Sequence, residues 1–286
     1  MKYYTLVTNE HELSHLNMVY RDHLRSVKDP NILFIANHNR VTITAYKTGT
    51  IVLSGEDING ELFAIKKMLN REDFEAIGSD EVGTGDVFGP VAVCAAYTTV
   101  EDIEFLESLN VRDSKNITDR EIAKIAPQIA KRLTHSLIIL TPEKYNLLVS
   151  EGYNLNRIKA HLHNQAIISL TAKLKDKDIP VIVDQFCTPQ LYFNYLKDET
   201  LVYRDIQFFT KAENVHKSVA AAAIIARYGF LYSMQQCSKK AGVKLLKGAS
   251  KKVDEQLEEI IEENGTKILN NIAKTNFKNV TRLTNQ

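Results

Sequence analysis

The stretch GSDEVGTGDVFGP, residues 78–90, holds three acidic residues and four glycines, although the whole chain has only 12 glycines. Neighbouring carboxylates repel each other and glycine loses much backbone entropy on folding, so such a stretch opposes stability. Apolar segments flank it: residues 76–80 and 91–97 predict two strands joined by a glycine loop. We interpret this junction as part of a functional site, because acids and glycines do not favour strands.

Strands and helices alternate along the chain from about residue 72 onward. The further strands that we expect are 136–140, 180–183 and 206–209, and the expected helices are 118–133, 155–174 and 216–236. Such alternation predicts an α/β domain, residues 72–286, in which helices cover a central sheet. The C-terminal part of this domain is expected to be helical and begins with a lysine-rich patch.

Residues 1–68 have a different pattern and predict a small α+β domain. In RVTITAYKTGTIVLSG, residues 40–55, apolar and polar residues alternate on both sides of a turn at Lys47–Gly49. The segment ELFAIKKMLN, residues 61–70, follows with helical spacing. Acidic or nucleophilic residues are not concentrated here, so we predict a binding or packing role for this domain.

The composition is that of a soluble globular protein, with 286 residues, 44% of them hydrophobic and 25% charged. The formal net charge of +1 neither indicates nor excludes nucleic acid, because charge can segregate onto one face. Three cysteines without a CxxC spacing predict buried thiols rather than a zinc site. The sequence shows no signal peptide and no apolar run near ~18 residues, which predicts a cytoplasmic protein without a membrane span.

Four acidic residues occupy positions where α/β proteins build sites. Asp80 and Glu81 end one strand, Asp184 ends another, and Glu213 precedes the helix that starts near His216. If they meet, each like-charge pair at ~4 Å costs on the order of 4 kcal/mol at an effective dielectric near 20. Divalent cations offset such repulsion, and two ions ~3.5–4 Å apart can catalyse phosphodiester hydrolysis. The pattern therefore favours a metal-dependent nuclease, although each acid alone could be a turn or cap residue.

The glycines have a rival interpretation as a dinucleotide-binding loop. Gly83 and Gly85 match the start of the GxGxxG fingerprint, but Gly89 comes one residue late and a strand follows instead of a helix. A nucleotide-cofactor enzyme is therefore the weaker hypothesis. Glycines that bring backbone amides close to a sugar-phosphate chain fit better.

Basic residues near the acids are candidate phosphate contacts. Ser114 and Lys115 lie in the segment RDSKN before a helix, and Lys211 lies just before Glu213. The alternative for each lysine, as for the C-terminal lysine patch, is a solvated surface charge. His161 and His163 point in different directions on one helix, and we predict surface or capping roles for both.

Several long segments together resemble the type 2 ribonuclease H family, in its ribonuclease HIII branch. They are GSDEVGTGDVFGPVAV, RDSKNIT, YNLNRIKAHLHNQAI, VIVDQF and TKAENVHKSVAAAAIIARY. The segment TITAYKTGTIVLSG is similar to the TATA-binding-protein-like domain of that branch, which binds the RNA/DNA hybrid. The resemblance implies an RNase H-like α/β domain with a mixed central sheet flanked by helices, and a monomeric protein.

The resemblance also implies the chemistry. It assigns the family's four metal-binding carboxylates to Asp80, Glu81, Asp184 and Glu213, with two Mg²⁺ or Mn²⁺ ions during catalysis. The implied reaction is endonucleolytic cleavage of the RNA strand of RNA/DNA hybrids, which leaves 5′-phosphate and 3′-hydroxyl ends. A non-catalytic hybrid-binding protein on the same fold is the alternative, although all four carboxylates are present.

The resemblance further implies which residues contact substrate. It places backbone of Gly83, Thr84 and Gly85 against ribose 2′-hydroxyl groups, and Ser114 and Lys115 against the substrate as well. The ribonuclease HII branch usually has arginine where this chain has Thr84 and aspartate where it has Glu213. That branch also uses a downstream tyrosine to recognise an RNA–DNA junction, whereas this chain has no tyrosine after Tyr232. These differences favour cleavage inside ribonucleotide runs. Ala223 stands where serine is common, and we expect little effect on the chemistry.

Overall fold

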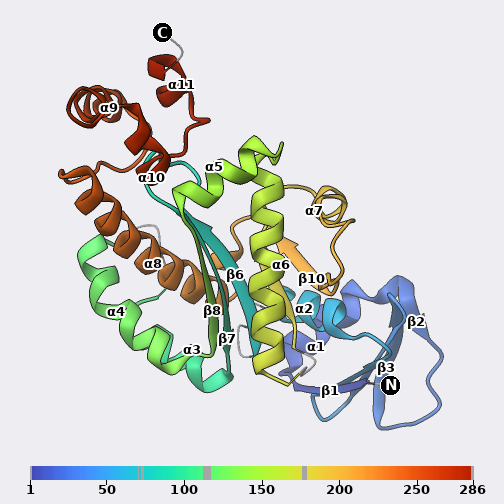
Figure 1. Cartoon of the computed structure of the whole chain (residues 1–286). Coiled ribbons are helices and arrows are strands. Elements are labelled where there is room, and N and C mark those ends of the chain that lie inside the picture. Colours follow the sequence, from blue (N-terminus) through green and yellow to red (C-terminus); the bar gives the residue numbers. More distant parts are fainter. Residues whose placement is uncertain (1, 70, 72–73, 112–116, 176–178, 285–286) are drawn as a thin grey trace. The chain divides into compact units, whose positions relative to one another are not determined.

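The computed structural model describes residues 2–69, 71, 74–111, 117–175 and 179–284. The chain divides into two compact units, an N-terminal unit, Met1–Phe74, and a C-terminal unit, Glu75–Gln286. Figure 1 shows both units, coloured along the sequence from blue at the N-terminus to red at the C-terminus. Within the described residues, no helix is long and apolar enough to cross a membrane.

The N-terminal unit is one antiparallel sheet covered by two helices. The strand order is β1-β5-β4-β3-β2. Its elements are β1 (Lys2–Val7), α1 (Glu10–Val19), β2 (Leu24–Arg25), β3 (Ile32–His38), β4 (Val41–Tyr46), β5 (Thr50–Gly55) and α2 (Asn59–Met68). The predicted alternation in residues 40–55 is confirmed as β4 and β5, joined by a turn in which Gly49 has φ +89°.

One face of this sheet is buried and the other is open. On β4 and β5 the buried side chains, Ile43, Ile51 and Leu53 among them, share a core with Leu16 and Ile65 of the two helices. The intervening residues of the same strands are only half-buried. The sheet therefore leaves a face that no described helix of its own unit covers.

The C-terminal unit is built on a mixed five-stranded sheet of order β10-β9-β6-β7-β8. Strands β10, β9 and β6 are parallel to one another, whereas β7 is antiparallel to both β6 and β8. The strands are β6 (Ala76–Val82), β7 (Val91–Thr98), β8 (His135–Leu140), β9 (Val181–Asp184) and β10 (Ile206–Phe209). The strands expected from the sequence are thus confirmed, with ends shifted by a residue or two.

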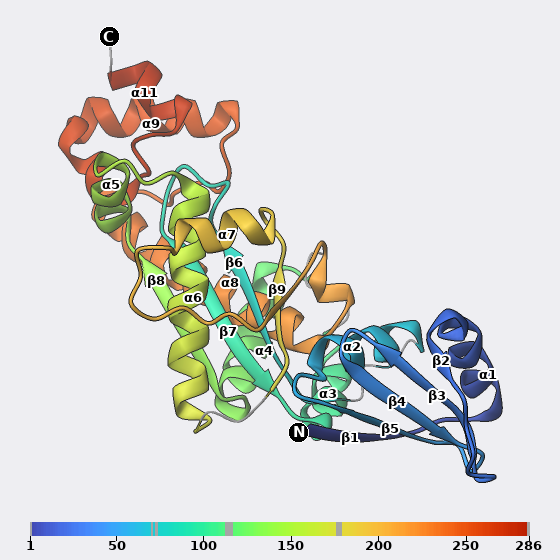
Figure 2. The ribbon, with the colours of Figure 1, turned by 90° about the vertical axis from the view of Figure 1, so that its right-hand side faces the viewer.

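Helices cover both faces of this sheet, as the two views in Figures 1 and 2 show. Because every residue of β7 is buried and successive side chains alternate, Val91 and Val93 pack toward α6, whereas Ala92 and Cys94 pack toward α8. The helices are α3 (Val100–Ser108), α4 (Asp119–Arg132), α5 (Pro142–Ser150), α6 (Leu155–Lys173), α7 (Pro189–Tyr195) and α8 (Lys217–Ala241). This arrangement is a three-layer α/β fold.

The close approach of β6 to α8 depends on Gly78. A β-carbon there would lie 2.2 Å from the backbone nitrogen of Val219, so only glycine fits. Helix α8 itself ends at Ala241, five residues beyond the expected end at Gln236, and Gly242 with φ +72° caps it. Gly78 therefore brings the start of α8 against the strand that carries the acidic pair.

The remaining helices form the C-terminal end of the chain. They are α9 (Lys251–Asn264), α10 (Leu269–Ile272) and α11 (Lys278–Thr284). Their buried residues join the core on the α8 face of the sheet. Of the three cysteines, Cys94 and Cys237 are buried as expected, whereas Cys187 is only partly buried because it lies in the loop after β9.

Candidate active site

Sheet register brings Asp80 and Asp184 side by side. In the parallel pair of β6 and β9, Ser79 lies opposite Val183, and the next residue on each strand is one of the two aspartates. Because the register is shared, both side chains point to the same face of the sheet. Two alternate residues of β6, Gly78 and Asp80, face α8 at this point.

Glu81 points to the other face, toward α6. Its Oε1 accepts a hydrogen bond from Lys159 Nζ at 2.7 Å, and its Oε2 lies 2.8 Å from His163 Nε2. His163 is fully buried, and its Nδ1 lies 2.7 Å from the hydroxyl of Ser79, which precedes Glu81 by two residues on the strand. The surface or capping role predicted for His163 is wrong, because the helix face that carries it packs on β6.

Phe186, just after β9, supports the same pair on α6. Its ring stacks on the His163 ring with centroids 5.3 Å apart, and Lys159 Nζ lies 4.0 Å from its centroid. Burial alone would raise the pKa of Glu81, but His163 and Lys159 together hold this pKa below its ordinary value. Glu81 is therefore a carboxylate that its surroundings keep charged.

Glu213 is delivered by a short turn in front of α8. The 3-10 helix Ala212–Asn214 contains it, and the backbone N–H of Ala212 donates to Asp184 Oδ1 at 2.9 Å. Lys211 precedes this turn with φ +58°, and its side chain is exposed. The hydrogen bond fixes the turn to the end of β9, which places Glu213 beside the aspartates.

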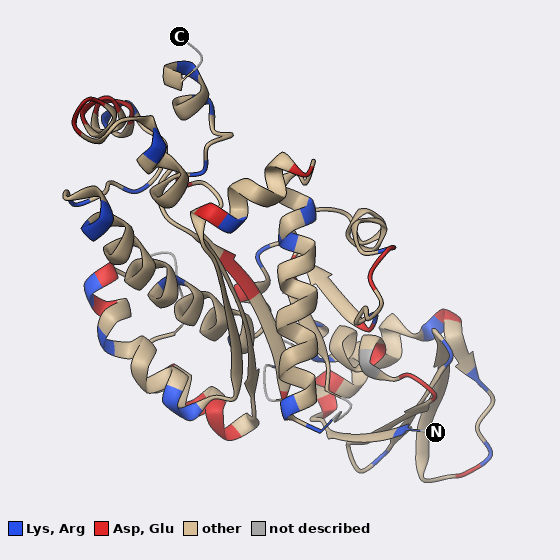
Figure 3. Cartoon of the chain, in the orientation of Figure 1, with Lys and Arg blue, Asp and Glu red and all other residues tan. Residues whose placement is uncertain are grey.

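All four predicted carboxylates line one cavity of about 270 Å³, together with Arg227 and Ala223. In Figure 3 the acidic pair of β6 appears as a red segment within a sheet that is otherwise almost uncharged. Burial, followed by the charges of Glu81 and Asp184, raises the pKa of Asp80 well above its ordinary value, and Glu213 adds to this effect. A hydrogen bond from the backbone of Glu81 to Asp80 Oδ1, 2.7 Å long, partly opposes it. The cavity thus concentrates negative charge in a buried place.

The donor set of this cavity fits a hard divalent cation. Carboxylate oxygens are the ligands that Mg²⁺ and Mn²⁺ prefer, and a cation would offset the repulsion that perturbs Asp80. The side chains do not converge as a finished cage: among the residues described, no group of three or more His, Cys, Asp or Glu is arranged to hold a metal ion. Glu81 is one reason that the carboxylates do not converge, because its two oxygens are directed at Lys159 and His163.

The two glycines of the loop after β6 differ sharply in their surroundings. A β-carbon at Gly83, which has φ +94°, would lie 2.3 Å from the carbonyl oxygen of Pro90. At Gly85 nothing lies within 4 Å of such an atom, and the residue is exposed. The fold itself therefore requires glycine at position 83 and leaves position 85 open to a ligand. Thr84, between them, is half-buried.

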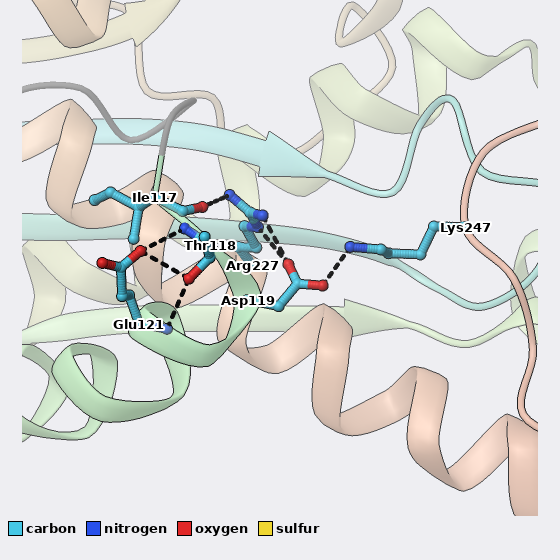
Figure 4. A network of polar contacts seen from close by, with 6 residues as sticks. All are labelled: Ile117, Thr118, Asp119, Glu121, Arg227 and Lys247. Carbon is cyan, nitrogen blue, oxygen red and sulfur yellow. Dashed lines mark hydrogen bonds and ion pairs between the residues drawn. The ribbon is translucent and has the colours of Figure 1, made fainter.

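Ser114 and Lys115 lie outside the described residues, but the chain just after them is anchored near the cavity. Arg227 of α8 donates to the carbonyl of Ile117 at 2.9 Å and to Asp119 Oδ1 at 2.7 Å (Figure 4). Asp119 is also paired with Lys247, and Thr118 caps α4 through a reciprocal pair of bonds with Glu121. One side chain of the cavity thus fixes the start of α4.

The family model described as Ribonuclease HII matches residues 77–280, which contain all four carboxylates. The chain belongs to the ribonuclease HII family. The resemblance seen in the sequence is confirmed, as is the mixed sheet flanked by helices. A second model, described as a domain of unknown function (DUF3378), matches residues 5–64 in the N-terminal unit.

Relatives named ribonuclease HIII are similar to this member of the ribonuclease HII family over nearly its whole length. That of Phytoplasma mali (strain AT) is 46% identical and covers 99% of this chain and 98% of its own. That of Bacillus pumilus (strain SAFR-032) is 35% identical and covers 96% of each chain. A crystal structure of Bst-RNase HIII in complex with Mn²⁺ is 34% identical, with a TM-score of 0.74 over 99% of this chain and 98% of that one.

Proposed function

We propose that this chain is a ribonuclease HIII, a metal-dependent endoribonuclease that hydrolyses the RNA strand of RNA/DNA hybrids. The observation that carries the proposal is the meeting of Asp80, Glu81, Asp184 and Glu213 at one cavity of a ribonuclease HII-family fold. Full-length similarity to ribonucleases named HIII, one of them solved with Mn²⁺, supports it. The products are 5′-phosphate and 3′-hydroxyl ends.

The carboxylates take different parts in this proposal. Asp80 and Asp184, adjacent in the sheet and on one face, would hold the central metal, and Glu213 and Glu81 would complete the ligand set. Two bound Mg²⁺ or Mn²⁺ ions would supply an activated water and stabilise the leaving oxygen. Lys159 and His163 keep Glu81 ionised, so we assign them a supporting role in maintaining the charge of this ligand.

Recognition of the ribose falls to the loop that follows the acidic pair. We assign Gly83, Thr84 and Gly85 to contact with 2′-hydroxyl groups, because the open space at Gly85 allows backbone to approach a sugar closely. Lys211 is exposed beside Glu213 and suits a phosphate next to the scissile one. Ser114 and Lys115 remain candidate substrate contacts on the strength of the sequence alone.

The N-terminal unit is proposed to bind the hybrid through the open face of its sheet. Half-buried hydroxyl side chains, among them Thr42, Thr44 and Ser54, alternate with core residues and lie on this face. Tyr3 and Val7 of the edge strand β1 are 67% and 68% exposed. Hydroxyl groups and a tyrosine can contact a nucleic acid backbone without a strong charge.

We expect removal of the N-terminal unit, residues 1–74, to weaken hybrid binding without changing the metal requirement. The loss should be on the order of tenfold, and the plot of log K against log salt should become shallower by ~0.9 for each phosphate that a Lys or Arg of this unit neutralises in the whole chain. Fluorescence anisotropy at several salt concentrations measures both. An affinity equal to that of the whole chain would refute the role of this unit.

The substrate class is tested with three labelled duplexes of equal length in Mg²⁺. They are an RNA/DNA hybrid, a DNA duplex with one ribonucleotide, and a DNA-only duplex. We expect fast internal cutting of the RNA strand, much slower cutting at the single ribonucleotide, and none of DNA. Equal or faster cutting at the single ribonucleotide would place the enzyme with the other branch of its family, and cutting of DNA would exclude the proposal.

A further inference from the structure

Lys274 is a lysine buried in the C-terminal part of the chain. Its side chain is fully buried, although lysine is almost never so without a partner. It follows α10, and its Nζ lies 6.0 Å from the ring centroid of Tyr145 and 5.8 Å from that of Phe277. Lys274 is not among the residues that line the cavity of the four carboxylates.

The ammonium group of Lys274 holds the second half of the glycine loop. Its Nζ donates to the carbonyl oxygens of Asp86 and Gly89, at 2.7 and 2.8 Å. The backbone N–H of Lys274 donates to the carbonyl of Val87, and the N–H of Gly89 donates to that of Ile272, both at 2.8 Å. Lys274 alone thus binds three carbonyl groups of the loop, those of Asp86, Val87 and Gly89.

The position of this half of the loop is passed directly to Gly83. Gly89 leads into Pro90, whose carbonyl oxygen packs so closely on Gly83 that no β-carbon fits between them. On its other side the loop is tied to Gly248, whose N–H donates to Asp86 Oδ1 at 2.6 Å. A shift at Gly89 would therefore also move Gly83. Because Gly85 follows Gly83 by only two positions, the exposed Gly85 would move with it.

We propose that Lys274 is a positioning residue, which fixes the backbone of Gly83–Gly85 for its contact with ribose 2′-hydroxyl groups. The inference rests on the proposed function and names a determinant of ribose specificity outside the loop itself. It is carried by the convergence of a buried ammonium group on Asp86 and Gly89.

Burial of this group is costly, which argues against a mere packing role. Burial lowers the pKa of Lys274 to about 8, while the negative charge of Asp86 opposes this shift. A methionine or leucine could fill the same space without that cost. What an apolar side chain cannot supply is two hydrogen bonds to loop carbonyls that are turned inward.

The test is a double-mutant cycle between Lys274 and the substrate. Two hybrids are compared, one with a continuous RNA strand and one with deoxyribonucleotides beside the main cleavage site. For the unaltered enzyme we expect this replacement to lower kcat/KM about tenfold, as the loss of one or two hydrogen bonds does. With Lys274→Met, which keeps length and removes the donors, we expect a penalty of about twofold or less.

Two further variants separate positioning from stability. Lys274→Gln keeps an N–H₂ donor on a shorter side chain and should recover part of the penalty. Leu257→Ala removes a buried core side chain of α9 and should lower thermal stability while the tenfold penalty stays. An equal loss of kcat/KM on both hybrids with Lys274→Met would overturn the inference.

The outcomes also separate this inference from the proposed function. If the unaltered enzyme cleaves neither hybrid, the proposed function itself is refuted. If it cleaves both hybrids with the same kcat/KM, the role of the loop is refuted and, with it, that of Lys274.

A second variant tests the same inference if Lys274→Met does not fold. This variant is Asn146→Ala. The side-chain amide of Asn146 donates to the carbonyl of Ala273 and accepts from the N–H of Thr275, on the two sides of Lys274. We expect its loss, like that of the Lys274 ammonium group, to reduce the tenfold difference in kcat/KM between the two hybrids.

Discussion

Asp80→Asn is expected to remove RNA-strand cleavage while hybrid binding stays largely intact. The substitution keeps the size of the side chain and takes away one negative ligand from the centre of the cavity. Metal ions contribute several kcal/mol to such reactions, so we expect a rate loss on the order of 10³-fold. Single-turnover cleavage of a labelled hybrid measures the rate, and anisotropy in the same buffer measures binding.

The matched control is Asp198→Asn, which makes the same chemical change at an exposed aspartate of the C-terminal unit. It should cleave at the normal rate. The site assignment would be wrong if Asp80→Asn cleaved normally, or if it lost hybrid binding as completely as cleavage.

Gly85→Ala is expected to leave the fold intact and to slow cleavage. Nothing in the chain lies within 4 Å of the added methyl group, so the thermal midpoint should stay close to that of the unaltered protein. A ribose backed onto the loop would collide with the methyl group, and displacement of a substrate by ~1 Å can cost on the order of 10²-fold in rate.

Gly83→Ala makes the same change two residues earlier, and we expect it to lower the thermal midpoint of the protein. Its methyl group would meet the Pro90 carbonyl at 2.3 Å on a backbone with φ +94°, so the protein itself should be destabilised. Thermal unfolding and cleavage are measured for both variants. Normal cleavage by a stable Gly85→Ala protein would remove the loop from the substrate site.

The meeting of Asp80 and Asp184 could be predicted from the sequence, because position in a strand determines it. Asp80 and Asp184 each end an apolar segment, and the ends of parallel strands share an edge of the sheet. Asp80 and Glu81 are neighbours on one strand, and such neighbours face opposite sides of the sheet. The structure keeps that alternation, with Asp80 toward α8 and Glu81 toward α6, and the cavity spans the strand end.

The partners of Glu81 were missed although a signal existed. Lys159 and His163 are four residues apart on a helix and therefore share a face, whereas His161 and His163 are two apart and do not. No such signal exists for Lys274. It is one of many lysines in the sequence, and its contact with Gly89 joins residues 185 positions apart, which no local pattern reveals.

Metal dependence of hybrid cleavage tests the central claim most directly. The initial rate of RNA-strand cleavage is measured in EDTA, and again after Mg²⁺ or Mn²⁺ is added in excess. The account predicts no cleavage in EDTA and rapid internal cleavage, with 5′-phosphate and 3′-hydroxyl ends, once the ion is restored. Cleavage that persists in EDTA at an undiminished rate would contradict it.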